Sequence, residues 1–178
     1  MISLGSKIML QVYTGNGKGK TTSAIGLVMR ALGHNMKVFI IQFFKDKNFY
    51  GEQNILRKLK NVKIFSFAPK HPCFYKNVKI RLVESECKKA VDLIEKVFKE
   101  RKCDLLVLDE FNNAICGKFM DIKKIVCLLK NRPKNMEVII TGRNAPKQLL
   151  KIADLVSEIK EIKHPYKKGV KCRKGIEY

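Results

Sequence analysis

The sequence has 178 residues, which is enough for one well-packed domain and short for two. Hydrophobic residues make up 46% of it, a globular proportion, and no apolar run approaches the length of a membrane-spanning helix. The 37 Lys and Arg residues against 16 Asp and Glu give a formal net charge of +21, which indicates either an acidic partner or a lysine-rich solvated surface.

The first predicted elements enclose a glycine-rich stretch. An apolar run over residues 8–13 predicts a buried strand, and residues 23–32, followed by Gly33, predict a helix. A strand, a glycine-rich turn and a helix are the context of a phosphate-binding loop, whose backbone N–H groups point inward at the positive end of the helix. Lys20 would supply a mobile cation, and the Thr21 hydroxyl is placed to bind magnesium.

The glycine spacing is unusual. Gly15 and Gly19 enclose three residues, whereas the common phosphate-binding loop has four between its first glycine and its Gly-Lys-Thr ending. The strict alternation of Gly15, Gly17 and Gly19 does not fit the GxGxxG dinucleotide pattern either. The sequence therefore predicts a nucleoside triphosphate site that does not hold its ligand in the ordinary way.

The rest of the chain alternates between strands and helices. We predict strands at 37–44, 62–67, 104–108, 137–141 and 155–162, and helices at 52–59, 78–102, 121–129 and 146–153. Residues 45–51 form a polar loop, 68–77 an irregular segment with two prolines, and the end of the chain a basic tail. The expected fold is one α/β domain over residues 1–178, with a mostly parallel sheet covered on both faces by helices in the P-loop NTPase (RecA-like) architecture.

Two strand ends carry further candidate site residues. Asp109 and Glu110 close the most hydrophobic strand, where a carboxylate beside the phosphate loop can hold magnesium directly or through water. Arg143 ends another strand at the same edge; it either reaches the triphosphate or is solvated. Weaker candidates, for which surface or packing roles are the default, are Gln42, Lys45, Glu52, Lys163 and His164.

The cysteines and the chain start bear on the compartment. The six cysteines are scattered without a CxxC pair, and several fall in apolar runs as free thiols do. Residues 1–7 lack the long apolar core of a signal peptide. We expect a cytoplasmic protein.

Together these motifs resemble the P-loop type of corrinoid adenosyltransferase, the family of the cobinamide and cobalamin pathway. The Gly-Asn-Gly-Lys-Gly-Lys-Thr-Thr string is unusually specific, and the resemblance extends from the first strand to the last residue. The segments that carry it are Thr14-Gly15-Asn16-Gly17-Lys18-Gly19-Lys20-Thr21-Thr22, Gln42-Phe43-Phe44-Lys45, Gly51-Glu52-Gln53-Asn54, Val107-Leu108-Asp109-Glu110, Ile139-Ile140-Thr141-Gly142-Arg143, Ala153-Asp154-Leu155-Val156-Ser157-Glu158, Lys163-His164, Gly169-Val170-Lys171 and Gly175-Ile176-Glu177-Tyr178.

The resemblance implies that ATP is not hydrolysed. A Co(I) corrinoid such as cob(I)alamin attacks the ribose C5′ carbon of ATP, which binds in reversed orientation, and triphosphate leaves. Residues Thr14–Thr22 and Arg143 would bind ATP. Lys18 and Lys20 would stabilise the departing charge, and Thr21 and Glu110 would hold Mg²⁺ with Asp109 close by.

The family likeness also implies a corrinoid contact and protein partners. Relatives use a phenylalanine–tryptophan pair to displace the lower axial ligand of the corrinoid, and this chain has no tryptophan. Phe74 and Tyr75 lie in the corresponding loop. Only a few residues precede the first strand, so the N-terminal helix that covers the corrinoid in some relatives would be shorter or absent. An acidic flavodoxin-type electron donor and a homodimer are expected.

Two other function classes stay open from the residues alone. One is a P-loop ATPase or small-molecule kinase, with Glu110 orienting water. The other is a basic nucleic-acid-binding ATPase, which the net charge permits. The lysines are spread along the chain without a nucleic-acid motif, which favours the solvated surface over nucleic-acid binding.

Overall fold

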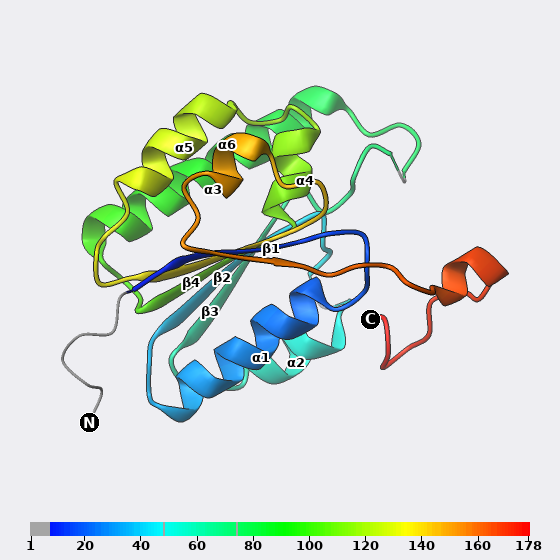
Figure 1. Ribbon diagram of the computed structural model, residues 1–178, viewed down its shortest axis with the longest axis horizontal. Coiled ribbons are helices and arrows are strands. Elements are labelled where there is room, and N and C mark those ends of the chain that lie inside the picture. The colour runs from blue at the N-terminus through cyan, green and yellow to red at the C-terminus, as the bar shows by residue number, and fades with distance from the viewer. Residues whose placement is uncertain (1–7, 48, 74) are drawn as a thin grey trace.

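A six-stranded sheet in which every pairing is parallel forms the centre of the molecule (Figure 1). The computed structural model describes residues 8–47, 49–73 and 75–178. The strand order is β3-β2-β4-β5-β1-β6, and the strands are β1 (Leu10–Thr14), β2 (Val38–Phe43), β3 (Val62–Phe67), β4 (Leu105–Asp109), β5 (Glu137–Thr141) and β6 (Leu155–Glu158). The predicted parallel sheet is confirmed.

Helices cover both faces of this sheet, as predicted. Figure 1 shows α1 and α2 on one face and α3, α4, α5 and α6 on the other. Their bounds are α1 (Lys20–Gly33), α2 (Gly51–Leu56), α3 (Ile80–Glu100), α4 (Phe111–Cys116), α5 (Ile122–Lys130) and α6 (Lys147–Leu150), and a short 3₁₀ helix η1 (Pro165–Lys168) lies in the tail.

The central strands are apolar along their whole length because both of their faces are buried. In β2, Val38 and Ile40 belong to the cluster that packs on α1 and α2, whereas Phe39 and Ile41 belong to the larger cluster under α3 to α6. All six residues of β2 are buried. Side chains that alternate between two cores fix the register of each strand, because a shift of one residue would exchange the two faces.

Most element boundaries differ from the sequence prediction by one to four residues, and three differences bear on the site. Helix α1 begins at Lys20, inside the glycine-rich motif. Helix α4 was not predicted, since its six residues are too few to display a helical period. Strand β6 ends at Glu158, four residues early, because the backbone at Ile159 turns to the glycine loop and accepts a hydrogen bond from the Gly17 N–H at 2.8 Å.

Some expectations are only partly within reach of the described residues. Residues 1–7 lie outside the described residues, and so does Phe74. The expectations about the N-terminal helix over the corrinoid and about a signal peptide concern residues 1–7. Among the helices that the structure describes, none is both long and apolar enough to cross a membrane. Of the six free cysteines, Cys87 and Cys103 are buried and the other four are exposed.

Candidate functional site

The glycine loop between β1 and α1 is held against the segment that follows β6. Gly15 has φ +100, and a Cβ added to it would lie 2.4 Å from the carbonyl oxygen of Ile159. A Cβ on Gly17 would lie 2.6 Å from the carbonyl oxygen of Lys160. Two of the alternating glycines are therefore required by close backbone contact, and Gly15 also by its positive φ.

The loop leads into the first turn of α1, where Lys20 is the first residue. Lys20 is 7% exposed, and its Nζ donates to the carbonyl oxygen of Gly17 at 2.7 Å, so the lysine curls back over the loop. Burial lowers the pKa of Lys20, while the charge of Glu110 opposes that shift. The N–H groups at the start of this 14-residue helix have no partners within the helix, which makes its N-terminus attractive to an anion.

Asp109, the last residue of β4, joins three elements through its carboxylate. Its Oδ1 accepts from the Thr21 hydroxyl at 2.8 Å and from the Thr141 hydroxyl at 2.7 Å. Its Oδ2 lies 2.8 Å from Nζ of Lys45. Asp109 is 1% exposed, so this carboxylate fixes the positions of other groups and does not face solvent.

Lys45 and Asp109 form a buried ion pair. Burial on its own raises the pKa of Asp109. The charge and hydrogen bond of Lys45, together with the hydrogen bonds from Thr141 and Thr21, outweigh burial and hold that pKa below its ordinary value. For Lys45, burial lowers the pKa, but the charge and hydrogen bond of Asp109, together with the charges of Glu52 and Glu110, raise it above its ordinary value. The Lys45 ammonium also lies 4.6 Å from the centre of the Tyr50 ring and 3.4 Å from Oε1 of Glu52. Lys45 and Asp109 therefore both stay charged.

A second buried contact ties α2 to the same carboxylate. The Gln53 side-chain amide donates to Oε1 of Gln42 at 2.8 Å, and Nε2 of Gln42 lies 3.5 Å from Oδ2 of Asp109. Gln53 and Gln42 are 0% and 1% exposed. Helix α2 borders a cavity next to the glycine loop, so these hydrogen-bonded amides fix that side of the cavity relative to β4.

Glu110 is directed by an unusual backbone conformation. Its φ of 59 places it in the left-handed region, its N–H donates to the Thr141 hydroxyl at 2.9 Å, and its carboxylate accepts from the Asn113 side chain. Burial, and then the charge of Asp109, raise the pKa of Glu110. Neighbouring carboxylates with opposite shifts are typical of functional sites.

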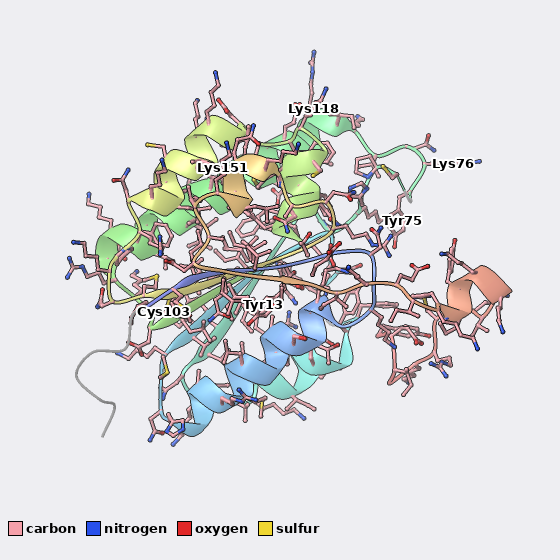
Figure 2. The ribbon with its side chains drawn as sticks, viewed as in Figure 1. Tyr13, Tyr75, Lys76, Cys103, Lys118 and Lys151 are labelled. Atoms are coloured by element: carbon pink, nitrogen blue, oxygen red, sulfur yellow. The ribbon has the colours of Figure 1, made fainter. Side chains whose placement is uncertain are left out.

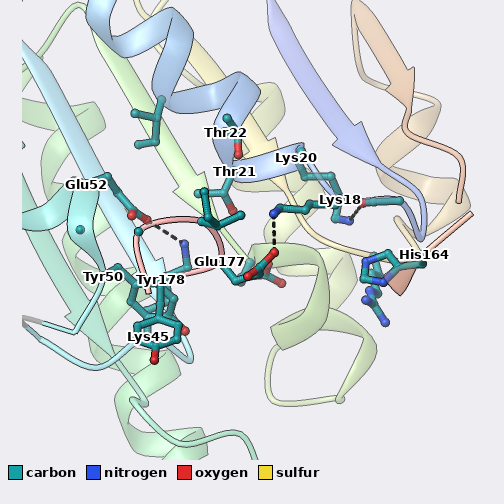
Figure 3. Close-up of a pocket in the computed structure, with 18 of the residues that line it drawn as sticks. Lys18, Lys20, Thr21, Thr22, Lys45, Tyr50, Glu52, His164, Glu177 and Tyr178 are labelled. Carbon is teal, nitrogen blue, oxygen red and sulfur yellow. Dashed lines mark hydrogen bonds and ion pairs between the residues drawn. The ribbon is translucent and has the colours of Figure 1, made fainter. Parts of the chain in front are cut away.

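These elements border a cavity of about 760 Å³, the size of a small-molecule site (Figure 3). The lining combines four cationic side chains, those of Lys18, Lys20, Lys45 and Arg143, with three carboxylates. Among the residues that the structure describes, the lining is Asn16, Gly17, Lys18, Gly19, Lys20, Thr21, Thr22, Ile25, Lys45, Tyr50, Gly51, Glu52, Ile55, Glu110, Arg143, His164, Gly175, Ile176, Glu177 and Tyr178.

Most of the residues predicted from the sequence meet at this cavity. Within the described residues, the lining includes Asn16 through Thr22, Glu110 and Arg143, but not Thr14, Gly15 or Asp109. The Thr14 hydroxyl instead accepts from the N–H of Ala145 at 3.1 Å.

Tyr75 lies on the loop after β3 and is 51% exposed, with Nζ of Lys70 5.8 Å from the centre of its ring (Figure 2). Figure 2 also shows Lys76, Lys118 and Lys151 on three separate segments, in keeping with a basic charge that is spread over the surface.

Two groups of site residues were underrated from the sequence. Lys45 was given a surface or packing role, but it is 7% exposed and bound to Asp109. Its position just after a predicted strand is the sequence signal that places it at the carboxyl edge of the sheet, whereas the structure alone shows that β2 neighbours β4. Glu177 and Tyr178 line the cavity although they lie more than 150 residues from Lys18. Their segment carries part of the family resemblance, but no local spacing indicates that it reaches the glycine loop.

The fold is that of a P-loop α/β protein of RecA-like architecture. Among solved structures, the chain is similar to a KaiC-like protein of Pyrococcus horikoshii OT3, with a TM-score of 0.51 and 14% identity over 85% of this chain and 71% of that chain. That likeness concerns the fold.

Sequence comparison gives the family. Residues 6–178 match the family described as ATP:corrinoid adenosyltransferase BtuR/CobO/CobP. The chain is 34% identical to a corrinoid adenosyltransferase of Escherichia coli K12 over 94% of its own length and 84% of that protein. The corresponding protein of Pseudomonas aeruginosa is 32% identical over 96% and 83%, and that of Salmonella typhimurium is 34% identical over 94% and 84%. The chain belongs to the ATP:corrinoid adenosyltransferase family, and it is an enzyme that transfers the adenosyl group of ATP to a corrinoid.

Proposed function

We propose that the adenosyl transfer takes place at the cavity at the N-terminus of α1, by attack of a Co(I) corrinoid on the C5′ carbon of ATP. The observation that carries this is the convergence of Lys18, Lys20 and Arg143 with the first turn of a 14-residue helix on one cavity. The cobalt–carbon bond forms with the electron pair of Co(I). The C5′–oxygen bond breaks, and its electron pair leaves with the triphosphate.

The cations of the cavity suit a leaving group of this kind. The departing triphosphate gains negative charge as the C5′–oxygen bond breaks, and groups already held in place stabilise that charge without reorganising. Lys20 is fixed by its bond to Gly17, and the helix N-terminus is fixed by the fold. Because the corrinoid supplies the nucleophile, the protein needs none of its own.

The donor set at the cavity fits Mg²⁺, which prefers oxygen ligands. The Thr21 hydroxyl donates a hydrogen bond to Asp109, so its lone pairs are available to a cation. The Glu110 carboxylate borders the same cavity. We propose that Thr21 and Glu110 hold the ion and that Asp109, whose oxygens already accept from protein donors, orients Thr21 from behind. When bound, Mg²⁺ would neutralise charge on the triphosphate oxygens.

The corrinoid would approach from the loop after β3. This loop leaves the carboxyl end of its strand, the edge at which the cavity lies, and it exposes Tyr75. We propose that Tyr75, together with Phe74, contacts the corrinoid. Replacing Tyr75 by alanine should raise the KM for the corrinoid and leave the KM for ATP unchanged; an effect on the ATP KM alone would refute this placement.

The charge supports a proposal on the electron donor, and the cysteines support one on the compartment. A net charge of +21 would attract an acidic flavodoxin-type reductant, so we expect the rate of electron delivery to fall steeply as ionic strength rises. Six free thiols are compatible with the cytoplasm.

We also propose a homodimer, which sedimentation at several protein concentrations would test.

An anaerobic assay tests the reaction. The protein is mixed with ATP, Mg²⁺ and chemically reduced cob(I)alamin, and the spectrum and the phosphate products are followed. We expect adenosylcobalamin and intact triphosphate in equal amounts. A variant with Lys20 replaced by methionine should lose the reaction, whereas replacement of the exposed Lys89 on α3 should not. ADP and phosphate without a corrinoid product would refute the proposal in favour of hydrolysis.

A further inference from the structure

The carboxylate of Glu177 contacts Lys18 of the glycine loop, one of the cations that the proposed function assigns to the triphosphate. Its Oε1 accepts from Nζ of Lys18 at 2.8 Å (Figure 3). The same oxygen accepts from Nη2 of Arg173 at 3.0 Å. The Lys18 and Glu177 side chains are 46% and 24% exposed, so the contact forms at the open mouth of the cavity. Hydrogen bonds from Arg173 and then Lys18 lower the pKa of Glu177 to about 2, so the group is a carboxylate at any physiological pH.

Two further contacts hold the segment Gly175–Tyr178, which we call the clasp, in this position. The ring of Tyr178 stacks on that of Phe49, with centroids 4.7 Å apart and planes 16° apart. The Gly175 N–H donates to the carbonyl oxygen of Tyr178 at 2.7 Å, which closes the clasp into a tight turn. The clasp therefore joins the glycine loop to the segment that follows β2, across the mouth of the cavity.

We propose that Glu177 is a built-in competitor for the triphosphate: it occupies Lys18 when the site is empty and regains that lysine as the product leaves. This inference rests on the proposed function, because it concerns triphosphate at the same site. Lys18 is the cation nearest to solvent in the glycine loop, and an ammonium that already faces a carboxylate offers less to a phosphate. A bound triphosphate would also be repelled by the Glu177 charge.

The exchange has a use in the catalytic cycle. The proposed product is a small, highly charged anion in a cavity with four cationic side chains, so its release would otherwise be slow. A carboxylate tethered beside Lys18 competes for that cation at a fixed high local concentration. Glu177 thereby weakens the binding of the product.

Calorimetric titration of the whole protein at low ionic strength and constant Mg²⁺ tests the proposal without a corrinoid. The probes are inorganic tripolyphosphate, ATP and adenosine. We expect Glu177→Gln to bind tripolyphosphate about two- to fivefold more tightly, the range of a partly exposed ion pair, and to bind adenosine unchanged. Tyr178→Ala, which releases the clasp, should tighten tripolyphosphate binding in the same direction, whereas Tyr178→Phe, which keeps the stacked ring, should match the wild type.

A matched control separates competition from net charge. Glu86→Gln removes the same charge from an exposed pair with Lys89 on α3, and it should leave tripolyphosphate affinity unchanged. Unchanged or weaker tripolyphosphate binding by Glu177→Gln would overturn the proposal. An equal change in adenosine affinity would also overturn it, because the clasp would then hinder every ligand of the cavity and not the triphosphate alone. If the wild type bound neither ATP nor tripolyphosphate, the nucleotide site itself would fail, a result distinct from a failure of the exchange.

Discussion

Replacing Lys45 by methionine would test whether the site is organised around the buried carboxylate of Asp109. The substitution keeps most of the apolar length of the side chain and removes only the ammonium. Asp109 is 1% exposed, and the Lys45 side chain is 8% exposed. The variant therefore leaves a buried carboxylate without its counter-charge, although both hydroxyl donors to Asp109 are retained.

The expected loss is large. Removing one partner of a buried pair costs about 3–5 kcal/mol in free energy of unfolding, because the remaining charge stays desolvated. In a domain of this size that loss lowers the melting temperature by roughly 6–20 °C. The loss depends on pH: without Lys45, burial favours the protonated form of Asp109, so the difference from the wild type should narrow as the pH falls from 7 toward 4.

Urea unfolding at pH 7, without ligand, measures the effect. Lys89→Met, which breaks an exposed pair with Glu86, is the control and should cost less than about 1 kcal/mol. Combining Lys45→Met with Asp109→Asn should restore part of the loss, because the pair is removed together. A loss below about 1 kcal/mol for Lys45→Met, or a double variant whose loss equals the sum of the single losses, would refute the reasoning.

The other predictions concern the loop and the proposed metal ligand. Gly15→Ala should lower both stability and ATP affinity more than Gly19→Ala, because both glycines have positive φ but only Gly15 meets backbone atoms within 4 Å; equal losses in urea unfolding and ATP titration would contradict this. Glu110→Gln should slow adenosyl transfer roughly a hundredfold while ATP still binds; a normal rate at limiting Mg²⁺ would exclude Glu110 as a ligand. Because burial raises the pKa of Glu110 and a metal binds the carboxylate form, the Mg²⁺ needed for half-maximal activity should rise as the pH falls toward that pKa.

Much of the fold was predictable from local pattern. The strands Val62–Phe67 and Glu137–Thr141 have the predicted bounds, since apolar runs bounded by turn residues carry a direct signal. Asp121 caps α5 through the Lys123 N–H, as its position before an apolar run indicates. Short elements such as α4 and η1 were missed, because each has too few residues for a period to show.

The sequence by itself determined the class of site. The glycine string requires a backbone that only glycine permits, and a parallel sheet brings strand ends such as Asp109 and Arg143 to one edge. Tertiary structure alone decided which groups touch. Lys45 is bound to Asp109 because β2 and β4 are neighbours, and Glu177 reaches Lys18 because the tail folds back across the cavity. Contacts between residues so distant in the chain depend on strand order and on the path of the tail, which no local spacing encodes.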